Sequence, residues 1–417
     1  MSRVVLVARA ALSGLGRGSL AASAGEAGES ARIATVVDEE LSSAGLARPF
    51  AARVAGLPAL GDRATSLLRA AFVDLRASLD RESPGWADRR VGVALATSSG
   101  GMRSAEELFR VLHDDGAPSA ALARDAQYFS PVDAVLAEQP FDAKPFTLVL
   151  TACAASTIAL GVAQAWLRAG ACDVAIAGGF DAVSVFVASG FEALRATTAS
   201  LPSRPFAKTR DGMVLGEGAA LLALMREADA DGIRKTARIY LDGFGASGDA
   251  VHVTAPDRTG DGLTRAALAA LGDAPLDAIE LVSAHGTATP FNDAAESRAI
   301  ARVVPHPVVV HPFKAQIGHT LGAAGALESL AAIDAIERGV VPASVCEGER
   351  DPDAPATLLP VAERRSIDAA LKLSAAFGRS SKAIRLRLVK LGRLSPDDAP
   401  APRSRGPSRE PAAAPAG

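Results

Sequence analysis

One cysteine stands where the chain passes from a strand-like segment into a helix-like one. Cys153 lies in Thr151-Ala-Cys-Ala-Ala-Ser156, after the apolar run 146–150 and before an alanine-rich helical pattern over 157–170. A helix N-terminus carries partial positive charge and free N–H groups, and both favour thiolate over thiol. Small neighbours leave room for a bulky acyl group at the sulfur. The stretch therefore suits a nucleophile, although cysteine is also a common buried structural residue.

Two histidines occupy loops rich in glycine and threonine, each after an expected strand. His285 lies within residues 284–293, and His319 lies five residues after Lys314. In an α/β sheet the loops at the carboxyl ends of strands gather at one edge, where ligands bind. Because Cys153 has the same kind of position, the pattern favours one site that holds a thiol and two imidazoles. The remaining cysteines and histidines are interpreted as structural: Cys172, Cys346, His113, His252, His306 and His311.

One cysteine and two histidines could also hold zinc. The spacings are long, however, and the chain has neither a CxxC pair nor an HxxxH pair. Lys314 lies near His319 in the sequence, and a cation beside a site disfavours a second cation. We therefore rank acyl chemistry well above metal binding and expect no metal.

Length and composition limit the class of protein. The chain has 417 residues, 49% apolar and 4% aromatic, which is enough for two domains or one large duplicated unit. A formal net charge of −3 argues against general nucleic-acid binding. Three cysteines in a chain this long do not make a disulfide framework, which fits a reducing, cytoplasmic setting. Charges interrupt the most apolar windows at Arg9, Arg168 and Asp173, so we expect neither a signal peptide nor a membrane span.

The order of expected elements indicates an α/β protein with parallel strand pairs. The expected strands of the first half are 3–8, 90–95, 146–150, 172–179 and 218–224. The expected helices there are 62–79, 105–113, 131–138 and 157–170. A fainter second series follows, with strands at 238–243, from 281 and at 308–312 and a helix over 325–339. Residues 14–18 are interpreted as a loop, and residues 20–57 stay mostly unassigned.

Three sequence blocks resemble the signatures of the β-ketoacyl-acyl-carrier-protein synthases, the condensing enzymes of fatty acid and polyketide assembly. The blocks surround Cys153, His285 and the Lys314–His319 segment, and they occur in the family's order. Residues 205–218 and 243–252 also resemble the elongating branch. The likeness implies an α/β thiolase-like fold, with two duplicated βαβαβαββ halves in a five-layer α-β-α-β-α arrangement.

The resemblance also divides the chain. It implies an N-terminal half over residues 1–230 that carries the cysteine and a C-terminal half over 231–390 that carries the two histidines. From about residue 391 the composition turns to proline, arginine, serine and alanine with no apolar pattern. We expect residues 391–417 to be a disordered tail.

The family mechanism, carried over by resemblance, fits the local chemistry. Cys153 would take an acyl group from the phosphopantetheine thioester of a carrier protein. Malonyl carrier protein would then lose carbon dioxide while His285 and His319, as Nε donors, stabilise the charge on its thioester carbonyl. The enolate would attack the Cys153 thioester, and the reaction would need no cofactor.

Other residues receive roles from the same resemblance. The N–H groups of Cys153 and Phe377 would form the oxyanion hole, with Gly378 in the gating loop. Lys314 would orient the site, and Thr287 and Thr289 would bind the pantetheine arm. The supporting residues would be Glu328, as the partner of Lys314, and Asp293. The residues that would dock the acidic carrier protein are Arg63, Arg69 and Arg204, and an ordinary solvated charge stays open for each of them.

One departure from the family pattern concerns the gate. The usual Gly-Phe-Gly-Gly loop has Arg379 in place of a glycine, which restricts positive φ and adds bulk and charge. We interpret this as a sign of a specialised pathway synthase rather than a housekeeping enzyme.

Four functions stay open at this point. The first choice is an elongating ketosynthase that acts on carrier-bound acyl chains, for which the family resemblance implies a homodimer. The second is a ketosynthase active only in a heterodimer with a chain-length partner, in a type II polyketide or polyene pathway. The third is a chain-length partner without chemistry of its own, which typically lacks the cysteine. The fourth is a thiolase, which uses a second cysteine as base and lacks the histidine pair.

Overall fold

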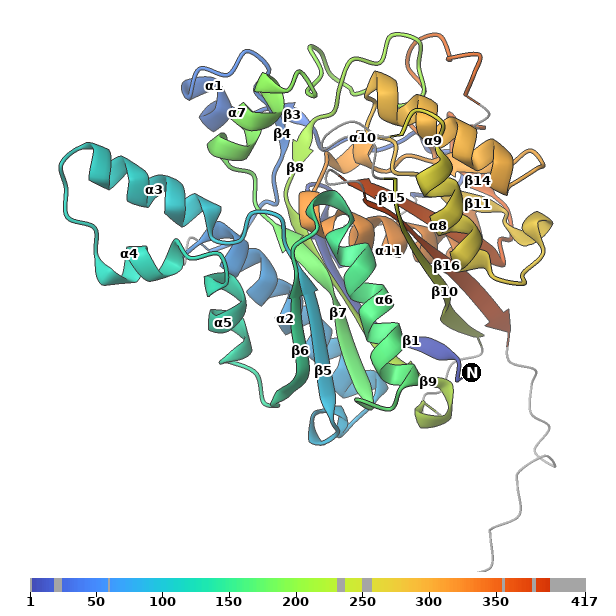
Figure 1. Ribbon diagram of the computed structural model, residues 1–417, viewed down its shortest axis with the longest axis horizontal. Helices are drawn as coiled ribbons and strands as arrows, with labels where there is room; N and C mark the ends of the chain where they lie inside the picture. The colour runs from blue at the N-terminus through green and yellow to red at the C-terminus, as the bar shows by residue number, and fades with distance from the viewer. Residues whose placement is uncertain are drawn as a thin grey trace, which may run out of the picture.

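The computed structural model describes residues 2–18, 25–58, 61–230, 237–249, 257–354, 357–376 and 380–390 (Figure 1). The segment around Phe377, Gly378 and Arg379 and the expected tail 391–417 lie outside these residues.

Ten of the described strands form two five-stranded units with the same internal order. The first unit runs β6 (Ala143–Val149), β5 (Val91–Ala96), β7 (Val174–Asp181), β9 (Gly218–Arg226), β1 (Val4–Ser13). The second runs β12 (Val309–His311), β11 (Leu281–Ser283), β15 (Ala369–Ala376), β16 (Ser380–Lys390), β10 (Ala237–Gly248). Numbered in chain order within each unit, the strands lie side by side in the order third, second, fourth, fifth, first, with the third strand at the free edge. Because both units share this order, the predicted duplication is confirmed.

The two units meet at their first strands. β1 and β10 pair antiparallel, with Val5 opposite Tyr240, so the ten strands follow one another in a single path. Within each unit the second strand pairs parallel with the third and the fourth, and the fifth strand is antiparallel to its neighbours. Parallel pairing brings the carboxyl ends of these strands to the same edge, which is where the cysteine and histidine loops begin.

Helices cover both units and fill the space between them, which gives the expected five layers (Figure 1). The middle layer holds α6 (Ala155–Arg168) and α11 (Ala324–Arg338), whose apolar side chains share one core with both units. Outside the first unit, α2 (Arg63–Glu82) packs in a second core, which includes Leu67 and Phe72. Outside the second unit, α8 (Asp261–Leu271) and α9 (Pro290–Val303) pack in a third core.

The two middle helices pack closely at their N-termini because small residues face one another. A Cβ atom at Gly325 would lie 2.1 Å from Thr157 Oγ1, so no other residue fits there without displacement. The Ala326 N–H donates to Ser156 Oγ at 3.0 Å. This contact joins the helix that follows the cysteine to the helix that follows His319, and it explains why both helices are rich in alanine and glycine.

Shorter elements complete the fold. They are α1 (Glu39–Ser43), α3 (Met102–His113), α4 (Ala120–Asp125), α5 (Ser130–Leu136), α7 (Val185–Ala193), α10 (Lys314–Ile317), β2 (Gly16–Arg17), β3 (Val36–Val37), β4 (Phe50–Ala52), β8 (Leu215–Gly216), β13 (Val340–Val341) and β14 (Glu363–Arg364). Single 3₁₀ turns lie at 86–88, 152–154, 227–229, 276–278 and 321–323. α3 and α4 extend away from the body at the left of Figure 1. Among the described helices, none is both long enough and apolar enough to cross a bilayer.

The sequence-based assignment was incomplete at the N-terminus. Part of the expected 14–18 loop is β2, which pairs with the end of β1 at Leu12 and Ser13. The mostly unassigned stretch contributes α1, β3 and β4, and β4 pairs with β8 from the other end of the N-terminal half. β2 and β3 have two residues each, which is too short to leave an alternating pattern in the sequence.

Candidate active site

A tight turn presents Cys153 at the start of the first middle helix. β6 ends at Val149, a 3₁₀ turn covers Ala152–Ala154, and α6 begins at Ala155. Ala152 has φ of 48°, a left-handed conformation that is uncommon for a residue with a side chain. Cys153 is buried, with 7% of its surface exposed.

The second half repeats this turn with a glycine in place of the cysteine. Thr320-Leu-Gly-Ala precedes α11 as Thr151-Ala-Cys-Ala precedes α6, and Leu321 has φ of 51°. The Gly322 N–H donates to Asp181 Oδ2 at 2.6 Å, which joins the turn to the end of β7. The second copy of the turn therefore carries no nucleophile and instead fixes the backbone next to His319.

Both histidines are held in one tautomer. His319 Nδ1 accepts from the Leu321 N–H at 3.1 Å, so the proton of the neutral ring is on Nε2. His285 Nδ1 lies 3.1 Å from Lys314 Nζ, which can only donate, so this ring also carries its proton on Nε2. Among the described residues, the buried His319 Nε2 has no hydrogen-bond partner.

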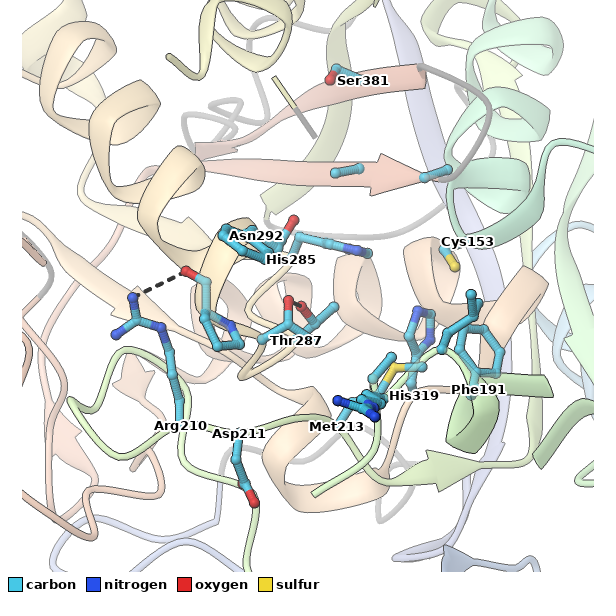
Figure 2. Close-up of a pocket in the computed structure, with 18 of the residues that line it drawn as sticks. Cys153, Phe191, Arg210, Asp211, Met213, His285, Thr287, Asn292, His319 and Ser381 are labelled. Atoms are coloured by element: carbon cyan, nitrogen blue, oxygen red, sulfur yellow. Dashed lines mark hydrogen bonds between the residues drawn. The ribbon is translucent and has the colours of Figure 1, made fainter. Parts of the chain in front are cut away.

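The cysteine and the two imidazoles share one space. The ring centroids of His285 and His319 are 5.7 Å apart, with the ring planes at 87°. Figure 2 shows both rings and the Cys153 sulfur directed toward one another from three separate loops. Burial and the nearby Lys314 ammonium lower the pKa of both histidines well below the usual value, so both rings are neutral at pH 7. Two neutral N–H donors facing one volume suit the stabilisation of a developing oxyanion.

A buried ionic network lies behind His285. The Lys314 ammonium donates to the His285 carbonyl at 2.7 Å and to Glu328 Oε1 at 2.5 Å, so Glu328 is its partner, as predicted. A second lysine, Lys372, lies 2.6 Å from the other oxygen of Glu328. Lys372 was not predicted as a site residue, because it lies in an otherwise apolar strand pattern. All three side chains are at most 3% exposed.

Two acidic side chains of α9 hold loops at the site, Glu296 the His285 loop and Asp293 the loop that contains Phe206. The Glu296 carboxylate accepts from the N–H groups of His285 at 2.6 Å and Gly286 at 2.8 Å. Asp293 Oδ2 accepts from the Phe206 N–H at 2.8 Å. Burial raises the pKa of Asp293 to about 6 and that of Glu296 to about 7. Asp293 was expected to support the site, whereas Glu296 was missed; its position three residues further along the helix was the available signal.

The cysteine and both histidines line a cavity of about 580 Å³ (Figure 2). Thr287 and Thr289 line the same cavity, and their hydroxyls lie 2.9 Å apart. Most of the remaining wall is apolar at Phe191, Leu194, Met213, Pro290 and Phe291. A cavity of this size, apolar with a few convergent polar groups, suits a chain-like substrate with a polar reacting end.

The charge state of the thiol differs from the sequence expectation. Burial raises the pKa of the Cys153 thiol to about 12, although the Lys314 ammonium acts in the opposite direction. The helix N-terminus therefore does not by itself make a resting thiolate, because desolvation of the buried sulfur outweighs it.

This leads to a prediction about alkylation. Since only the thiolate reacts, and its fraction rises with pH below the pKa, we expect iodoacetamide to modify Cys153 about tenfold faster per pH unit from pH 7 to 10. The measurement is mass spectrometry of the Cys153 peptide after timed exposure, with free cysteine as the control. A rate that levels off below pH 8 would show that the resting site holds a thiolate.

The three arginines expected to dock a carrier have different surroundings. Arg63 lies 2.5 Å from the fully buried Glu217, so its guanidinium is already engaged inside the protein. Arg69 is partly exposed and forms an ion pair with Glu138. Arg204 donates to Ser200 Oγ at 3.1 Å and lies 3.6 Å from Asp211, which lines the cavity.

The residues interpreted as structural are distributed elsewhere. Cys172 is buried and Cys346 exposed, both as free thiols, and His311 bonds Gln316 at 2.9 Å. His252 lies outside the described residues. Within the described ranges, no three His, Cys, Asp or Glu side chains group in a way that could hold a metal ion.

Comparisons of sequence and structure relate the chain to known proteins. The description "Beta-ketoacyl synthase, N-terminal domain" matches residues 76–230, and "Beta-ketoacyl synthase, C-terminal domain" matches residues 239–346. A granaticin polyketide β-ketoacyl synthase of Streptomyces violaceoruber is 32% identical over 344 residues, covering 78% of this chain and 81% of its own. The 3-oxoacyl-[acyl-carrier-protein] synthase 2 of a Synechocystis strain is 33% identical over 303 residues, which cover 69% of this chain and 72% of that protein. The solved structure of the ishigamide ketosynthase/chain length factor superposes with a TM-score of 0.84 at 29% sequence identity. The superposition covers 93% of this chain and 99% of the other.

Proposed function

The chain belongs to the β-ketoacyl synthase family of condensing acyltransferases, and we propose that it joins an acyl group held on Cys153 to a malonyl unit carried by an acyl carrier protein. The observation that carries the proposal is the convergence of Cys153, His285 and His319 on one cavity. The alternatives of a chain-length partner and a thiolase fit less well. The nucleophile is present, and two histidines rather than a second cysteine face it.

In the first half-reaction the Cys153 sulfur attacks the thioester carbonyl of the acyl carrier. The new carbon–sulfur bond forms on Cys153, the bond to pantetheine breaks, and the pantetheine sulfur leaves with the proton that the thiol gives up. The Cys153 N–H, at the start of α6, donates to the carbonyl oxygen as it becomes negative, and Phe377 remains the proposed second donor. Thr287 and Thr289 hydrogen-bond the pantetheine arm in the cavity.

In the second half-reaction malonyl carrier protein occupies the same cavity. His285 and His319 donate from Nε2 to its thioester oxygen while the bond to the carboxylate breaks and carbon dioxide leaves. The electron pair of that bond forms an enolate, whose carbon attacks the Cys153 thioester. A carbon–carbon bond forms, the carbon–sulfur bond breaks, and the released sulfur takes a proton from solvent water. Loss of carbon dioxide drives the reaction, and the decarboxylation step requires from the protein only positioning and the two histidine donors.

The proposed protein partners are an acyl carrier protein and a second chain of the same fold. A carrier protein appears in the name of the Synechocystis relative, and a chain length factor appears in that of the ishigamide structure. Arg69 and Arg204 remain the candidate carrier contacts. A cytoplasmic setting belongs to the proposal because Cys153 reacts only as a free thiol.

The surface for a second chain lies at the free end of the first strand unit. β6 is the terminal strand, and no other described strand pairs with its outer edge. Near it in sequence, α3 buries only Ser104 and α4 buries no side chain. Phe109, Phe129 and Phe146 are 69%, 49% and 42% exposed. An unpaired edge strand and exposed aromatic residues favour a protein interface here.

The test is acyl transfer to the purified chain. We expect incubation with an acyl-loaded carrier protein to add the acyl mass to the peptide that contains Cys153, as measured by mass spectrometry. Malonyl carrier should then release the group as a β-ketoacyl product. An adduct that forms only after a second ketosynthase-like subunit is added would select the heterodimeric alternative. No adduct under either condition would contradict the proposal.

A further inference from the structure

Lys372 occupies a position where a charged side chain is unusual. It lies in the middle of β15, opposite Ser283 of β11 and Ile384 of β16, and its side chain is fully buried. Its strand neighbours Leu371 and Leu373 belong to the outer core between the second unit and α8. Because side chains alternate along a strand, Lys372 points the other way, into the middle layer that contains α11.

The Lys372 ammonium ends at the ionic network of the site. It lies 2.6 Å from Glu328 Oε2 and also donates to the Leu373 carbonyl. The other oxygen, Glu328 Oε1, accepts from Lys314 at 2.5 Å, so a single carboxylate lies between two ammonium groups. Lys314 in turn donates to His285. The order of contacts is Lys372, Glu328, Lys314, His285.

We propose that Lys372 is a positioning residue for the condensation reaction: a cation fixed to β15 that occupies one oxygen of Glu328 and so keeps Lys314 on His285. The physical reason is competition for one ammonium group. A carboxylate with a free oxygen would attract Lys314 to both of its oxygens and away from His285 Nδ1, since charge-assisted contacts are the stronger ones. With that oxygen occupied by Lys372, Lys314 keeps a hydrogen for the imidazole, and the tautomer with Nε2–H in the cavity is preserved.

The charges around the network support this role. Burial lowers the pKa of Lys372, whereas Glu328 acts to raise it and Lys314 acts to lower it further. Lys372 also contributes, through its positive charge, to the lowered pKa of His285 and His319. Lys372 also interacts electrostatically with Glu296, which binds the His285 loop.

The test removes the Lys372 ammonium by mutation and then adds ammonium ions in solution to replace it. Lys372→Ala leaves Glu328 Oε2 next to an empty volume, and we expect malonyl decarboxylation to fall about 10- to 100-fold, as for other residues that orient a catalytic group. Ammonium chloride should restore part of the turnover and of the melting temperature, because NH₄⁺ is the charged end of the missing side chain. Choline chloride at the same ionic strength should restore neither, since the cation is too large to reach Glu328.

Two further variants separate the charge from the volume and from simple burial. Lys372→Met fills the space with an apolar chain. Ammonium chloride should therefore not restore the decarboxylation rate that this variant loses. Lys382 is the matched control: it lies on the adjacent β16, is 7% exposed, and bonds the Ser381 carbonyl at 3.2 Å with no carboxylate partner among the described residues. Lys382→Met should leave turnover within about twofold of wild type, as expected away from the site.

The inference rests on the proposed function, and the readouts keep the two apart. Wild-type protein that neither accepts an acyl group nor decarboxylates malonyl carrier contradicts the proposed function, while the ammonium dependence of the melting temperature still tests Lys372. If Lys372→Met decarboxylates malonyl carrier at the wild-type rate, the proposed role of Lys372 is overturned. The same follows if ammonium and choline restore the turnover and melting temperature of Lys372→Ala equally. If Lys372→Ala does not fold, the decarboxylation rate of Lys372→Met alone tests the proposed role of Lys372.

Discussion

Replacing Cys153 with alanine abolishes acyl transfer but leaves malonyl decarboxylation measurable. Acyl transfer requires the sulfur, so we expect condensation to fall by about 10³-fold or more, as when other covalent nucleophiles are removed. Decarboxylation requires only the two Nε2–H donors, and neither histidine depends on Cys153 for its tautomer: His319 is fixed by Leu321 and His285 by Lys314. Carbon dioxide release and acyl adduct formation, measured on the same preparation, give the two rates.

Cys346→Ser is the matched control, because Cys346 is an exposed free thiol outside the cavity. It should form the adduct and the condensation product at wild-type rates. Acyl labelling of Cys153→Ala at an unchanged level would show that another residue accepts the acyl group. Loss of both activities in Cys153→Ala would show that the histidines do not act independently of the sulfur.

Replacing Lys314 with methionine should have the second-largest effect, on both activity and stability. The change removes the donor to His285 Nδ1 and to Glu328 Oε1, so the imidazole is free to change tautomer and turn an acceptor toward the substrate oxygen. We expect malonyl decarboxylation to fall by about 10²- to 10⁴-fold. Breaking a buried pair also costs about 3–5 kcal/mol in the free energy of unfolding, and the lower end applies because Lys372 still neutralises Glu328.

The two effects are measured by decarboxylation kinetics and by urea unfolding of the same variant. Lys208→Met serves as the control, because the Lys208 ammonium forms an exposed ion pair with Glu349. That control should change stability by less than about 0.5 kcal/mol. Normal turnover in a stable Lys314→Met protein would refute the idea that this ammonium orients His285.

The sequence is informative where chemistry needs several particular residues at fixed spacing. The blocks around Cys153, His285 and His319 each combine a reactive residue with the small residues that let backbones approach it, and such combinations are specific. The α/β class was predictable from the periodic patterns of the longer strands and helices, whereas the duplicated arrangement rested mainly on the family resemblance, because the second series of elements is fainter. In the structure, Glu328 lies beside Lys314, and Thr287 and Thr289 line the cavity, where the family resemblance places them.

The features of the site that could not be predicted depend on contacts between residues far apart in the sequence, which no local sequence pattern encodes. Lys372 sits in a strand-like run, where a single lysine normally marks a solvent-facing position; only the middle layer makes it part of the site. The raised pKa of Cys153 depends on how completely the surrounding loops cover the sulfur, and the helix N-terminus alone predicts the opposite direction. Arg63 looks like a free surface charge in the sequence because Glu217, its partner, is 154 residues away.

The repeated turn at Thr320-Leu-Gly has a consequence for redesign of the protein. A Cβ atom at Gly322 would lie 2.6 Å from Asp181 Oδ2 and 2.7 Å from Thr97 Cα. Protein engineering cannot therefore install a second thiol there to obtain a two-centred enzyme without also rebuilding the first half around Asp181. The internal repeat is therefore asymmetric by steric fit: the first turn presents Cys153 to the cavity, and the second is packed too closely against Asp181 to accept a side chain.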